Sequence, residues 1–419
     1  MIRVFLYNNS VMKNIYLDWA ATSVPDHEIL DKIHKVSIET FANASSVHSE
    51  GLKAKKLLED SRERCANALK VNKKNIFFTS GGTESNNISI YSIIKKKAKG
   101  RVLSTNIEHP SVLKPIEQLE YMGFDAIRID PEKNGIINPD KIEEQLTENT
   151  VLVSVIHVNN ETGAIQPVNK FGEIIARYSK KIGKKILFHS DGVQAAGKIP
   201  VDLENNNIDL YTISSHKVSG PKGVGLLYCR ENIDSLYKGG GQESNVRSGT
   251  ENIAGIYGFS LALQQAVDNI KQNLESAKEK CSLLMEELGK IKECRIIPDD
   301  CARFTIRAQS DSVHRDTVKQ TTEYETFSPY ILNFYIRNIP AEVLVRVMSE
   351  RGFYISAGAA CSSGKKSSQS QTLKAMRIEK SAALSSVRIS IGPQTQKQEL
   401  AEFCNVLEEE AKKLLNVYK

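Results

Sequence analysis

The feature that most constrains the fold is an alternation, from about residue 29 to 230, of short apolar runs with longer amphipathic stretches. A short run that is apolar throughout is typical of a strand buried on both faces, and helices between such strands favour a mostly parallel sheet covered on both sides. We therefore predict an α/β architecture here. The predicted helices cover residues 29–40 and 53–69, and the predicted strands cover residues 76–79, 101–104, 126–129, 152–157, 186–189, 210–214 and 224–229.

The pattern changes after the glycine triplet at residues 239–241. One long helix is predicted over about residues 253–288, followed by strands at 294–297 and 330–336 and a helix at 341–351, as in a smaller α+β domain. A chain of 419 residues exceeds one typical core, so two domains are expected. We predict a large domain at residues 27–270 and a small domain formed by residues 1–26 and 271–419, with the long helix as the connection.

Two polar segments stand outside this pattern. Residues 362–371 contain no apolar side chain and cannot bury themselves, so we predict a mobile loop over about residues 356–375 that carries Cys361. Residues 308–328 are also long and polar, and we expect them to lie away from every motif described below.

Composition argues against several other classes of protein. No stretch approaches the roughly twenty apolar residues of a membrane span, and the N-terminal residues do not resemble a signal peptide. The seven cysteines show no Cys-x-x-Cys spacing, which argues against a zinc site or a disulfide framework and favours a reducing compartment. The net charge of +6 is mild, and the lysine clusters are typical of solvated helix faces. We expect a cytoplasmic protein without a metal, a membrane contact or a direct nucleic-acid partner.

Lys217 is the first candidate for chemistry. It closes the segment Ser-Ser-His-Lys at residues 214–217, which follows a predicted buried strand and precedes a glycine-rich turn at residues 220–223. A desolvated amine loses its proton more readily and becomes a nucleophile that can form a Schiff base. Taken alone, the segment fits a surface lysine better, but four further motifs favour the chemical interpretation.

Each of these four motifs follows a predicted strand. Residues 80–85 open a helix, where glycine N–H groups and the helix N-terminus suit a phosphate, although many such turns are glycine-rich for steric reasons. Asp191, in the motif at residues 189–194, could pair with a protonated pyridoxal ring nitrogen or cap a helix. Residues 108–111 and 158–163 complete the set. Open α/β sheets bind ligands at the carboxyl ends of their strands, so these motifs predict one site.

Together these motifs resemble the cysteine desulfurases of the NifS/IscS type. The similar segments run in order from Tyr16 almost to the C-terminus, and the resemblance implies a fold-type-I pyridoxal-phosphate enzyme and a homodimer. The region around Cys361 resembles the branch of the family with a longer, mobile cysteine loop. The segments are residues 16–22, 82–86, 108–109, 159–163, 189–194, 215–217, 239–243, 247–250, 356–363 and 387–390.

The resemblance also implies residue roles. Lys217 would hold pyridoxal 5′-phosphate as a Schiff base, Asp191 would pair with the ring nitrogen, and Gln194 would bond the ring hydroxyl. His109 would stack on the ring and assist proton transfers. The remaining roles are phosphate binding by Gly82, Thr83, Ser214 and His216 with Thr250 from the partner subunit, carboxylate binding by Asn160 and Arg388, and sulfur acceptance by Cys361.

The implied reaction converts L-cysteine to L-alanine and leaves the sulfur as a persulfide on Cys361, from which a sulfur-acceptor protein serves iron–sulfur cluster assembly or tRNA thiolation. A lone cysteine is more often a small buried hydrophobe, but the polar residues after Cys361 argue against burial. Selenocysteine lyase activity is an alternative that uses the same residues. A plain aminotransferase would have no use for Cys361, and a catalytically silent assembly scaffold would not need Lys217 and Asp191.

Overall fold

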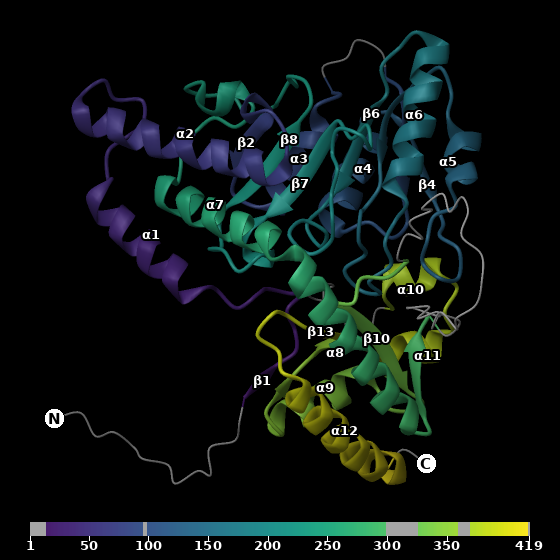
Figure 1. The fold of residues 1–419 in the computed structure, drawn as a ribbon. Helices are drawn as coiled ribbons and strands as arrows, with labels where there is room; N and C mark the ends of the chain where they lie inside the picture. Colours follow the sequence, from purple (N-terminus) through teal and green to yellow (C-terminus); the bar gives the residue numbers. More distant parts are fainter. Residues whose placement is uncertain (1–13, 95–98, 299–325, 359–368, 418–419) are drawn as a thin grey trace, which may run out of the picture.

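Two sheets organise two regions of the chain, a large region and a small one (Figure 1). The computed structural model describes residues 14–94, 99–298, 326–358 and 369–417. In Figure 1 the larger sheet and its helices lie above the smaller sheet, and helices α7 and α8 lead from one to the other.

The large region contains a seven-stranded sheet with the order β2-β8-β7-β6-β5-β3-β4. Among these strands only β8 runs antiparallel to its neighbours, so the prediction of a mostly parallel sheet is confirmed. The strands are β2 (Ile76–Thr79), β3 (Arg101–Thr105), β4 (Asp125–Ile129), β5 (Thr150–Ser154), β6 (Leu187–Asp191), β7 (Leu210–Ser214) and β8 (Gly225–Cys229).

The strand predicted at residues 152–157 extends too far at its C-terminal end. Strand β5 ends at Ser154, although the apolar run continues through Ile156. The backbone N–H of Ile156 donates to the side chain of Glu108 at 2.8 Å and not to a neighbouring strand. On the β6 side, however, the backbone N–H groups of Val155 and His157 still donate to the carbonyls of His189 and Asp191 at 3.1 and 2.9 Å, so only the pairing on the other side ends before Ile156.

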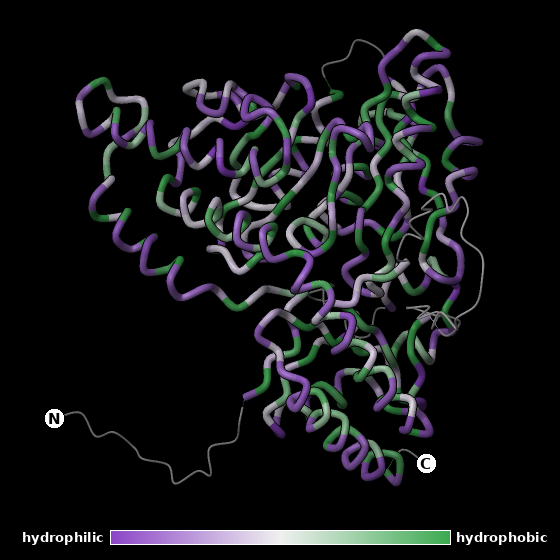
Figure 2. Tube along the Cα trace, in the orientation of Figure 1, coloured by the Kyte–Doolittle hydropathy of each residue, from purple (hydrophilic) through white to green (hydrophobic). Residues whose placement is uncertain are grey.

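Helices cover both faces of this sheet because consecutive strand residues point to opposite faces. Phe78 and Leu103 belong to the core shared with α2, α5, α6 and α7, whereas Phe77 and Val102 pack toward α3 and α4. Figure 2 shows hydrophobic and hydrophilic positions alternating along these helices. The helices are α1 (His27–Glu39), α2 (Ser49–Leu69), α3 (Gly82–Tyr91), α4 (Pro110–Tyr121), α5 (Pro139–Gln145), α6 (Val168–Ile182) and α7 (Ile253–Asp268).

The single helix predicted over residues 253–288 is wrong, because two helices occupy this stretch. Helix α7 ends at Asp268 and α8 (Ile270–Lys290) begins two residues later. The intervening Asn269 has φ −96° and ψ 8°, and its side-chain amide donates to the Gln265 carbonyl at 2.8 Å. The Gln265 carbonyl also accepts from the Asn269 backbone N–H at 3.2 Å, so the helical hydrogen bond is kept while the backbone of Asn269 leaves helical φ and ψ.

The small region has its own sheet, with the antiparallel order β12-β13-β10-β9, and a separate parallel pair of β1 and β11. Ile15 and Leu17 pack in its core, whereas Ile29 packs in the core of the large region. This distribution supports the predicted domain division, which stays a prediction. The elements are β1 (Ile15–Tyr16), β9 (Cys294–Ile297), β10 (Ile331–Ile336), α9 (Ala341–Glu350), β11 (Phe353–Tyr354), β12 (Ser356–Ala357), α10 (Gln371–Ala375), α11 (Lys380–Leu384), β13 (Ser386–Ser390) and α12 (Lys397–Val417).

The two predicted polar segments are described only in part. Strand β12 and helix α10 occupy the two ends of the stretch 356–375, and Cys361 lies outside the described residues. The expectation that residues 308–328 lie away from every motif is wrong at their described end. Phe327 is buried and pairs with Ala164, and the backbone N–H of Ser328 donates to the Gly163 carbonyl at 2.8 Å. Burial of Phe327 therefore brings this end against the motif at residues 158–163.

Within the described residues, no helix combines the length and the apolar character needed to cross a membrane.

Candidate active site

Candidate residues follow four strands that end at one edge of the large sheet. Strand β6 ends in Asp191, and β7 leads directly into a short 3-10 turn, Ser215–Lys217. Strand β2 leads to α3, whose first residue is Gly82, and the residues after β3 lead to His109, the N-cap of α4. Since these strands run in the same direction, their carboxyl ends lie together.

A cavity of about 470 Å³ lies at this edge and is closed on the other side by the small region. Thr250 does not line the cavity and is exposed on the surface, and Cys361 lies outside the described residues. Gly358, three residues before Cys361, does line the cavity. The predicted site residues that the structure brings together here are Gly82, Thr83, His109, Asn160, Asp191, Gln194, Ser214, His216, Lys217 and Arg388.

Asp191 and His109 are joined through two side chains that were not predicted to have a role. Asn86 donates to Asp191 Oδ2 at 2.7 Å and to Ser111 Oγ at 2.8 Å. Ser111 Oγ lies 2.7 Å from His109 Nδ1. Asp191 Oδ1 also accepts from the Val193 backbone at 3.0 Å, and Asp191 is only 3% exposed. The carboxylate is therefore oriented by neutral donors in a buried setting.

The contacts of His109 also determine which ring nitrogen carries the proton. The Ser111 backbone N–H donates to Nδ1 at 3.1 Å, so Nδ1 is an acceptor and the neutral ring carries its proton on Nε2. Burial lowers the pKa of His109, and nearby Lys217 lowers it further, against an opposing effect of Asp191. His109 is thus held as a neutral ring that can donate a hydrogen bond from Nε2.

Lys217 reaches across to the N-terminal segment of the chain. Its Nζ donates to the carbonyls of Ala20 and Ala21 at 2.5 and 2.7 Å. Both carbonyls belong to the motif at residues 16–22, which gives that motif a physical role. The amine is therefore placed at the wall of the cavity, between the strand-end residues and the N-terminal segment.

The start of α3 is suited to an anion. Its N-cap, Gly81, provides no side-chain hydrogen bond, so the first N–H groups of this ten-residue helix are uncapped. A side chain at Gly82 would come within 2.9 Å of Val193 Cγ2, so glycine is required for this close approach. His216 Nδ1 lies 3.1 Å from Thr22 Oγ1, and burial together with Lys217 lowers the pKa of His216 to about 4.

Arg388, on β13, lines the opposite wall. Its Nη1 donates to the Asn160 carbonyl at 2.9 Å, and its Nη2 pairs with Asp18 Oδ1 at 2.7 Å. Its Nε has no hydrogen-bond partner among the described residues, although the side chain is only 7% exposed. A buried guanidinium N–H without a partner is unusual and fits a site for an anionic group.

The segment beyond Cys361 is tied to the same cavity. Ser370 caps helix α10 and donates to the carboxylate of Glu161, which lines the cavity, at 2.5 Å. Burial raises the pKa of Glu161, while hydrogen bonds from Ser370 and Thr372 oppose this effect. Together with Gly358, this contact brings both flanks of the Cys361 segment to the cavity.

Asn86, Ser111 and Asp18 are residues that sequence reasoning left without a role. All three stand inside motifs that were recognised. The partners of two of them are distant in sequence: Asn86 lies 105 residues from Asp191, and Asp18 lies 370 residues from Arg388. The available signal for Asn86 was its position one helical turn after Gly82, on the first turns of the helix that opens the site.

The fold and the cavity define a class of protein. The profile of the family described as aminotransferase class-V matches residues 15–326, a span that contains the whole large sheet. The described residues hold no cluster of His, Cys, Asp or Glu side chains that could bind a metal ion.

Individual proteins narrow this class. The chain is 32% identical over 409 residues to the cysteine desulfurase IscS of Dictyoglomus turgidum, with 97% of this chain and 96% of that protein covered. It is 34% identical over 386 residues to the putative cysteine desulfurase IscS 1 of Bacillus subtilis, with coverage of 91% and 94%. A solved NifS-like protein superposes with a TM-score of 0.82 at 31% identity, covering 95% of this chain and 99% of the other. The chain therefore belongs to the cysteine desulfurases of the NifS/IscS type, and the resemblance in its motifs is confirmed.

Proposed function

We propose that the protein converts L-cysteine to L-alanine and keeps the sulfur as a persulfide on Cys361. The observation that carries this proposal is that Lys217, Asp191 and Arg388 line one cavity whose wall includes Gly358, three residues before Cys361. In the overall reaction a carbon–sulfur bond breaks, a sulfur–sulfur bond forms at Cys361, and a hydrogen replaces sulfur on the substrate carbon. The atoms balance without an added oxidant.

The residues of the cavity fit pyridoxal 5′-phosphate. The amine of Lys217, the buried carboxylate of Asp191 and the uncapped start of α3 match the aldehyde, ring nitrogen and phosphate of that cofactor. Asp191 accepts hydrogen bonds from neutral groups, Asn86 and the Val193 backbone, so a protonated ring nitrogen would supply its missing positive partner. When bound, the cofactor supplies an electron sink for the bonds at the substrate Cα and Cβ.

Several side chains would hold the cofactor and move protons around it. Lys217 would hold the cofactor covalently and, once released by the substrate amine, would take the proton from the substrate Cα. His109 would lie on the ring, with Nε2 as its donor, and Gln194 would face the ring hydroxyl. The phosphate ligands in this proposal are Gly82, Thr83, Ser214 and His216, with Thr250 of the partner subunit.

Arg388 and Asn160 would hold the substrate carboxylate. The unpartnered Nε of Arg388 supports this role, because a carboxylate would supply the missing acceptor. The Asp18 carboxylate and the Asn160 carbonyl already hold the two terminal nitrogens of the guanidinium. The orientation of Arg388 is thus set before the substrate arrives.

The described cysteines are poor candidates for the sulfur acceptor, which supports the assignment of Cys361. Cys65, Cys229, Cys281, Cys294 and Cys404 are all buried. Burial raises the pKa of Cys65, Cys294 and Cys404 to about 12, so these thiols are poor sources of the thiolate that attacks sulfur. These thiols also fit the proposed cytoplasmic location.

We propose that the protein is a homodimer. Phe41 and Val47, between α1 and α2, are 76% and 91% exposed, and Ile38 and Leu52 beside them are also exposed. Large apolar side chains gathered on one surface favour contact with another protein. Thr250 is exposed as well, as a residue that serves the partner's phosphate site would be in a single chain.

The sulfur would pass from Cys361 to an acceptor protein for iron–sulfur cluster assembly or tRNA thiolation. The direct test is to load the protein with pyridoxal 5′-phosphate, add L-cysteine with a thiol reductant, and measure alanine and sulfide. We expect equal amounts of both products, and none from Lys217→Ala. Formation of a keto acid without sulfide would indicate an aminotransferase, turnover of selenocysteine alone would indicate a selenocysteine lyase, and no product would indicate a scaffold.

A further inference from the structure

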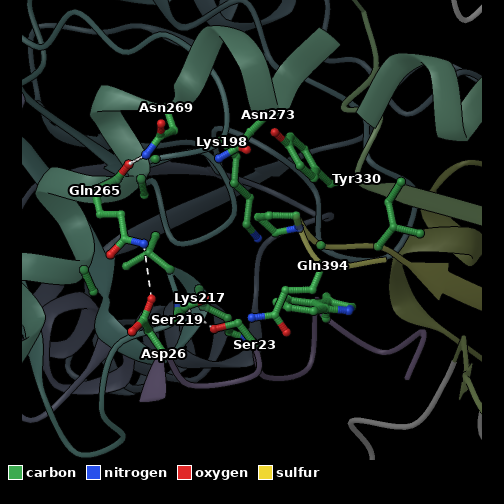
Figure 3. Close-up of a pocket in the computed structure, with 18 of the residues that line it drawn as sticks. Ser23, Asp26, Lys198, Lys217, Ser219, Gln265, Asn269, Asn273, Tyr330 and Gln394 are labelled. Carbon is green, nitrogen blue, oxygen red and sulfur yellow. Dashed lines mark hydrogen bonds between the residues drawn. The ribbon is translucent and has the colours of Figure 1, made fainter. Parts of the chain in front are cut away.

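Lys198 is a second lysine beside the cavity, and the proposed function leaves it without a role. It lines a separate cavity of about 190 Å³ between the two regions, whose wall includes Lys217, Asn273 and Gln394. Figure 3 shows the Lys198 side chain extending from beside Asn273 into this cavity. Lys217 lines both cavities, so Lys198 stands behind the wall that faces the proposed cofactor site.

Lys198 makes one hydrogen bond that reaches the cofactor cavity. Its Nζ donates to Oε1 of Gln194 at 2.6 Å, four residues earlier in the chain. The Nε2 of Gln194 donates to the Ala20 carbonyl at 2.8 Å, and the same carbonyl accepts from Lys217. Gln194 is buried and lines the cofactor cavity.

These two partners determine the orientation of the Gln194 amide. An ammonium or amine can only donate to the oxygen, and a carbonyl can only accept from the nitrogen. The contact with Ala20 therefore excludes the flipped amide, in which two carbonyl oxygens would face each other, and the ammonium form of Lys198 excludes it as well. Because the nitrogen carries two protons and Ala20 accepts one, the second N–H remains for a group in the cavity.

The protonation state of Lys198 does not remove this contact. Burial, with smaller effects from the positive charges of Lys217 and Arg388, lowers the pKa of Lys198 to about 7. Asp26 lines the same small cavity, but its Oδ2 accepts from Gln265. A neutral lysine amine still has N–H groups, so the hydrogen bond to Oε1 persists on both sides of the pKa.

We propose that Lys198 is a positioning residue for the cofactor, which keeps the N–H side of the Gln194 amide facing the cofactor ring hydroxyl. The inference rests on the proposed function, because it requires pyridoxal 5′-phosphate with its hydroxyl toward Gln194. An N–H donor stabilises negative charge on the ring oxygen, whereas a flipped amide would present an acceptor to it. Lys198 acts through Gln194 and does not touch the cofactor.

The test is a pH titration of the bound cofactor's absorption spectrum in the variant Lys198→Met. Weaker stabilisation of the ring oxygen should raise the apparent pKa of the chromophore by about one unit and weaken cofactor binding about tenfold, as expected for one lost hydrogen bond to a charged group. Lys198→Arg keeps a donor and should stay near the wild type. If Lys198→Met does not fold, Lys198→Leu, a shorter side chain without a donor, provides the same comparison.

Lys280→Met is the matched control. Lys280 is also buried and donates to the carbonyl of Pro393 at 3.2 Å, beside the same small cavity, but it has no contact with Gln194. Its removal should leave the chromophore titration unchanged. If Lys280→Met shifts the apparent pKa of the chromophore as much as Lys198→Met does, then loss of any lysine in this interface causes the shift, and the proposal is overturned.

A double-mutant cycle separates positioning through Gln194 from a direct effect of Lys198. Gln194→Leu should shift the titration in the same direction, and Lys198→Met should add little in the Gln194→Leu background. An unchanged titration in Lys198→Met, or additive shifts in the double variant, would overturn this inference alone. Absence of any covalent cofactor spectrum in the wild-type protein would overturn the proposed function instead.

Discussion

On the large-region wall of the cavity the polar side chains form hydrogen bonds with one another. On the small-region wall, Arg388 instead forms its hydrogen bonds with groups from other parts of the chain. Asp191, Asn86, Ser111 and His109 form a continuous chain of hydrogen bonds within the large region. Arg388 instead uses Asp18 from the N-terminal segment and the Asn160 carbonyl from the large region. The side chains of the first wall are therefore oriented by residues of the same region, whereas the side chain of Arg388 on the second wall is oriented by residues of other segments.

This difference indicates that the two walls have different functions: the first is proposed to hold the cofactor and the second to take part in substrate turnover. Residues of one chain that are proposed to hold the cofactor follow strands of one sheet, so their spacing is set by rigid elements. Arg388, which is proposed to hold the substrate together with Asn160 of the large region, comes from the small region, as do the described flanks of the Cys361 segment. The two regions meet where α7 ends and α8 begins. Changes on the first wall should affect cofactor binding, and changes on the second should affect turnover with the cofactor retained.

The largest effect is expected for Lys217→Ala on the first wall. Without its amine, the covalent cofactor chromophore should be lost entirely, and alanine formation should fall by a factor of roughly 10⁴ or more. Absorption spectra and borohydride reduction followed by peptide mapping provide the measurement. The exposed Lys222, changed to alanine, is the control and should keep the chromophore. Cofactor fixed to another lysine in Lys217→Ala would refute the assignment.

In the segment whose described flanks reach the second wall, Cys361→Ser should separate sulfur transfer from cofactor binding. Cysteine turnover should fall by a factor of roughly 10³, because the nucleophile that accepts the sulfur is gone, while the absorption spectrum is retained. Selenocysteine, whose selenium is a better leaving group, should keep more of its turnover. Cys301→Ser serves as the control with normal activity. Full cysteine turnover in Cys361→Ser, or labelled persulfide on another cysteine, would contradict the prediction.

A smaller effect on the same wall is expected for Arg388→Met. Loss of charge-assisted hydrogen bonds to the substrate carboxylate should raise KM for L-cysteine by about 10- to 100-fold, with unchanged cofactor affinity. Steady-state kinetics and a cofactor titration give the two quantities. Arg388→Lys should recover part of the loss, since it keeps the charge without the bidentate geometry. If cofactor affinity falls together with cysteine binding, the two walls are not independent.

The smallest expected effect is on the pH dependence of folding stability, and it involves His157, which lies behind the first wall. The His157 ring is buried against the Tyr211 hydroxyl, 2.8 Å away, and burial lowers the pKa of His157 from 6.5 to about 4. The unfolded chain therefore binds a proton below pH 6.5 that the folded protein excludes, and stability falls as the pH drops from 6.5 toward 4. Between pH 7 and pH 5 this costs about 2 kcal/mol.

His157→Gln provides the measurement, by urea unfolding of the apoprotein at both pH values. The variant lacks the titrating ring, so the difference in unfolding free energy between wild type and variant should narrow by about 2 kcal/mol at pH 5. Lowering the pH should not change this difference if the ring is solvated or already charged in the folded protein. The His157 backbone N–H donates to the Asp191 carbonyl, so the ring is expected to be buried behind Asp191. An unchanged difference would show that the ring is exposed to solvent there.

Much of this molecule was determined by the sequence itself. Strands buried on both faces are mostly apolar, and this requirement made the strands of the large sheet recognisable from their composition, although the edge strand β4 is only partly buried. Parallel strands end at one edge, so polar motifs after those strands predicted a shared site. Nine of the ten residues brought together lie in these motifs, and the tenth, Arg388, was expected from the family resemblance. The error at Ile156 arose where a side-chain hydrogen bond replaced a backbone one, and the error at Asn269 arose where the backbone leaves helical φ and ψ.

Only the tertiary structure decided which side chains touch. The contacts of Asn86 with Asp191, of Asp18 with Arg388, and of Lys217 with the Ala20 carbonyl join residues that are 105, 370 and 197 positions apart. Periodicity records which face of an element is buried, but it carries no information about the distance between two elements that pack at an angle. A hydrogen bond requires that distance to be correct within a few tenths of an ångström, so it becomes visible only when the whole core is packed.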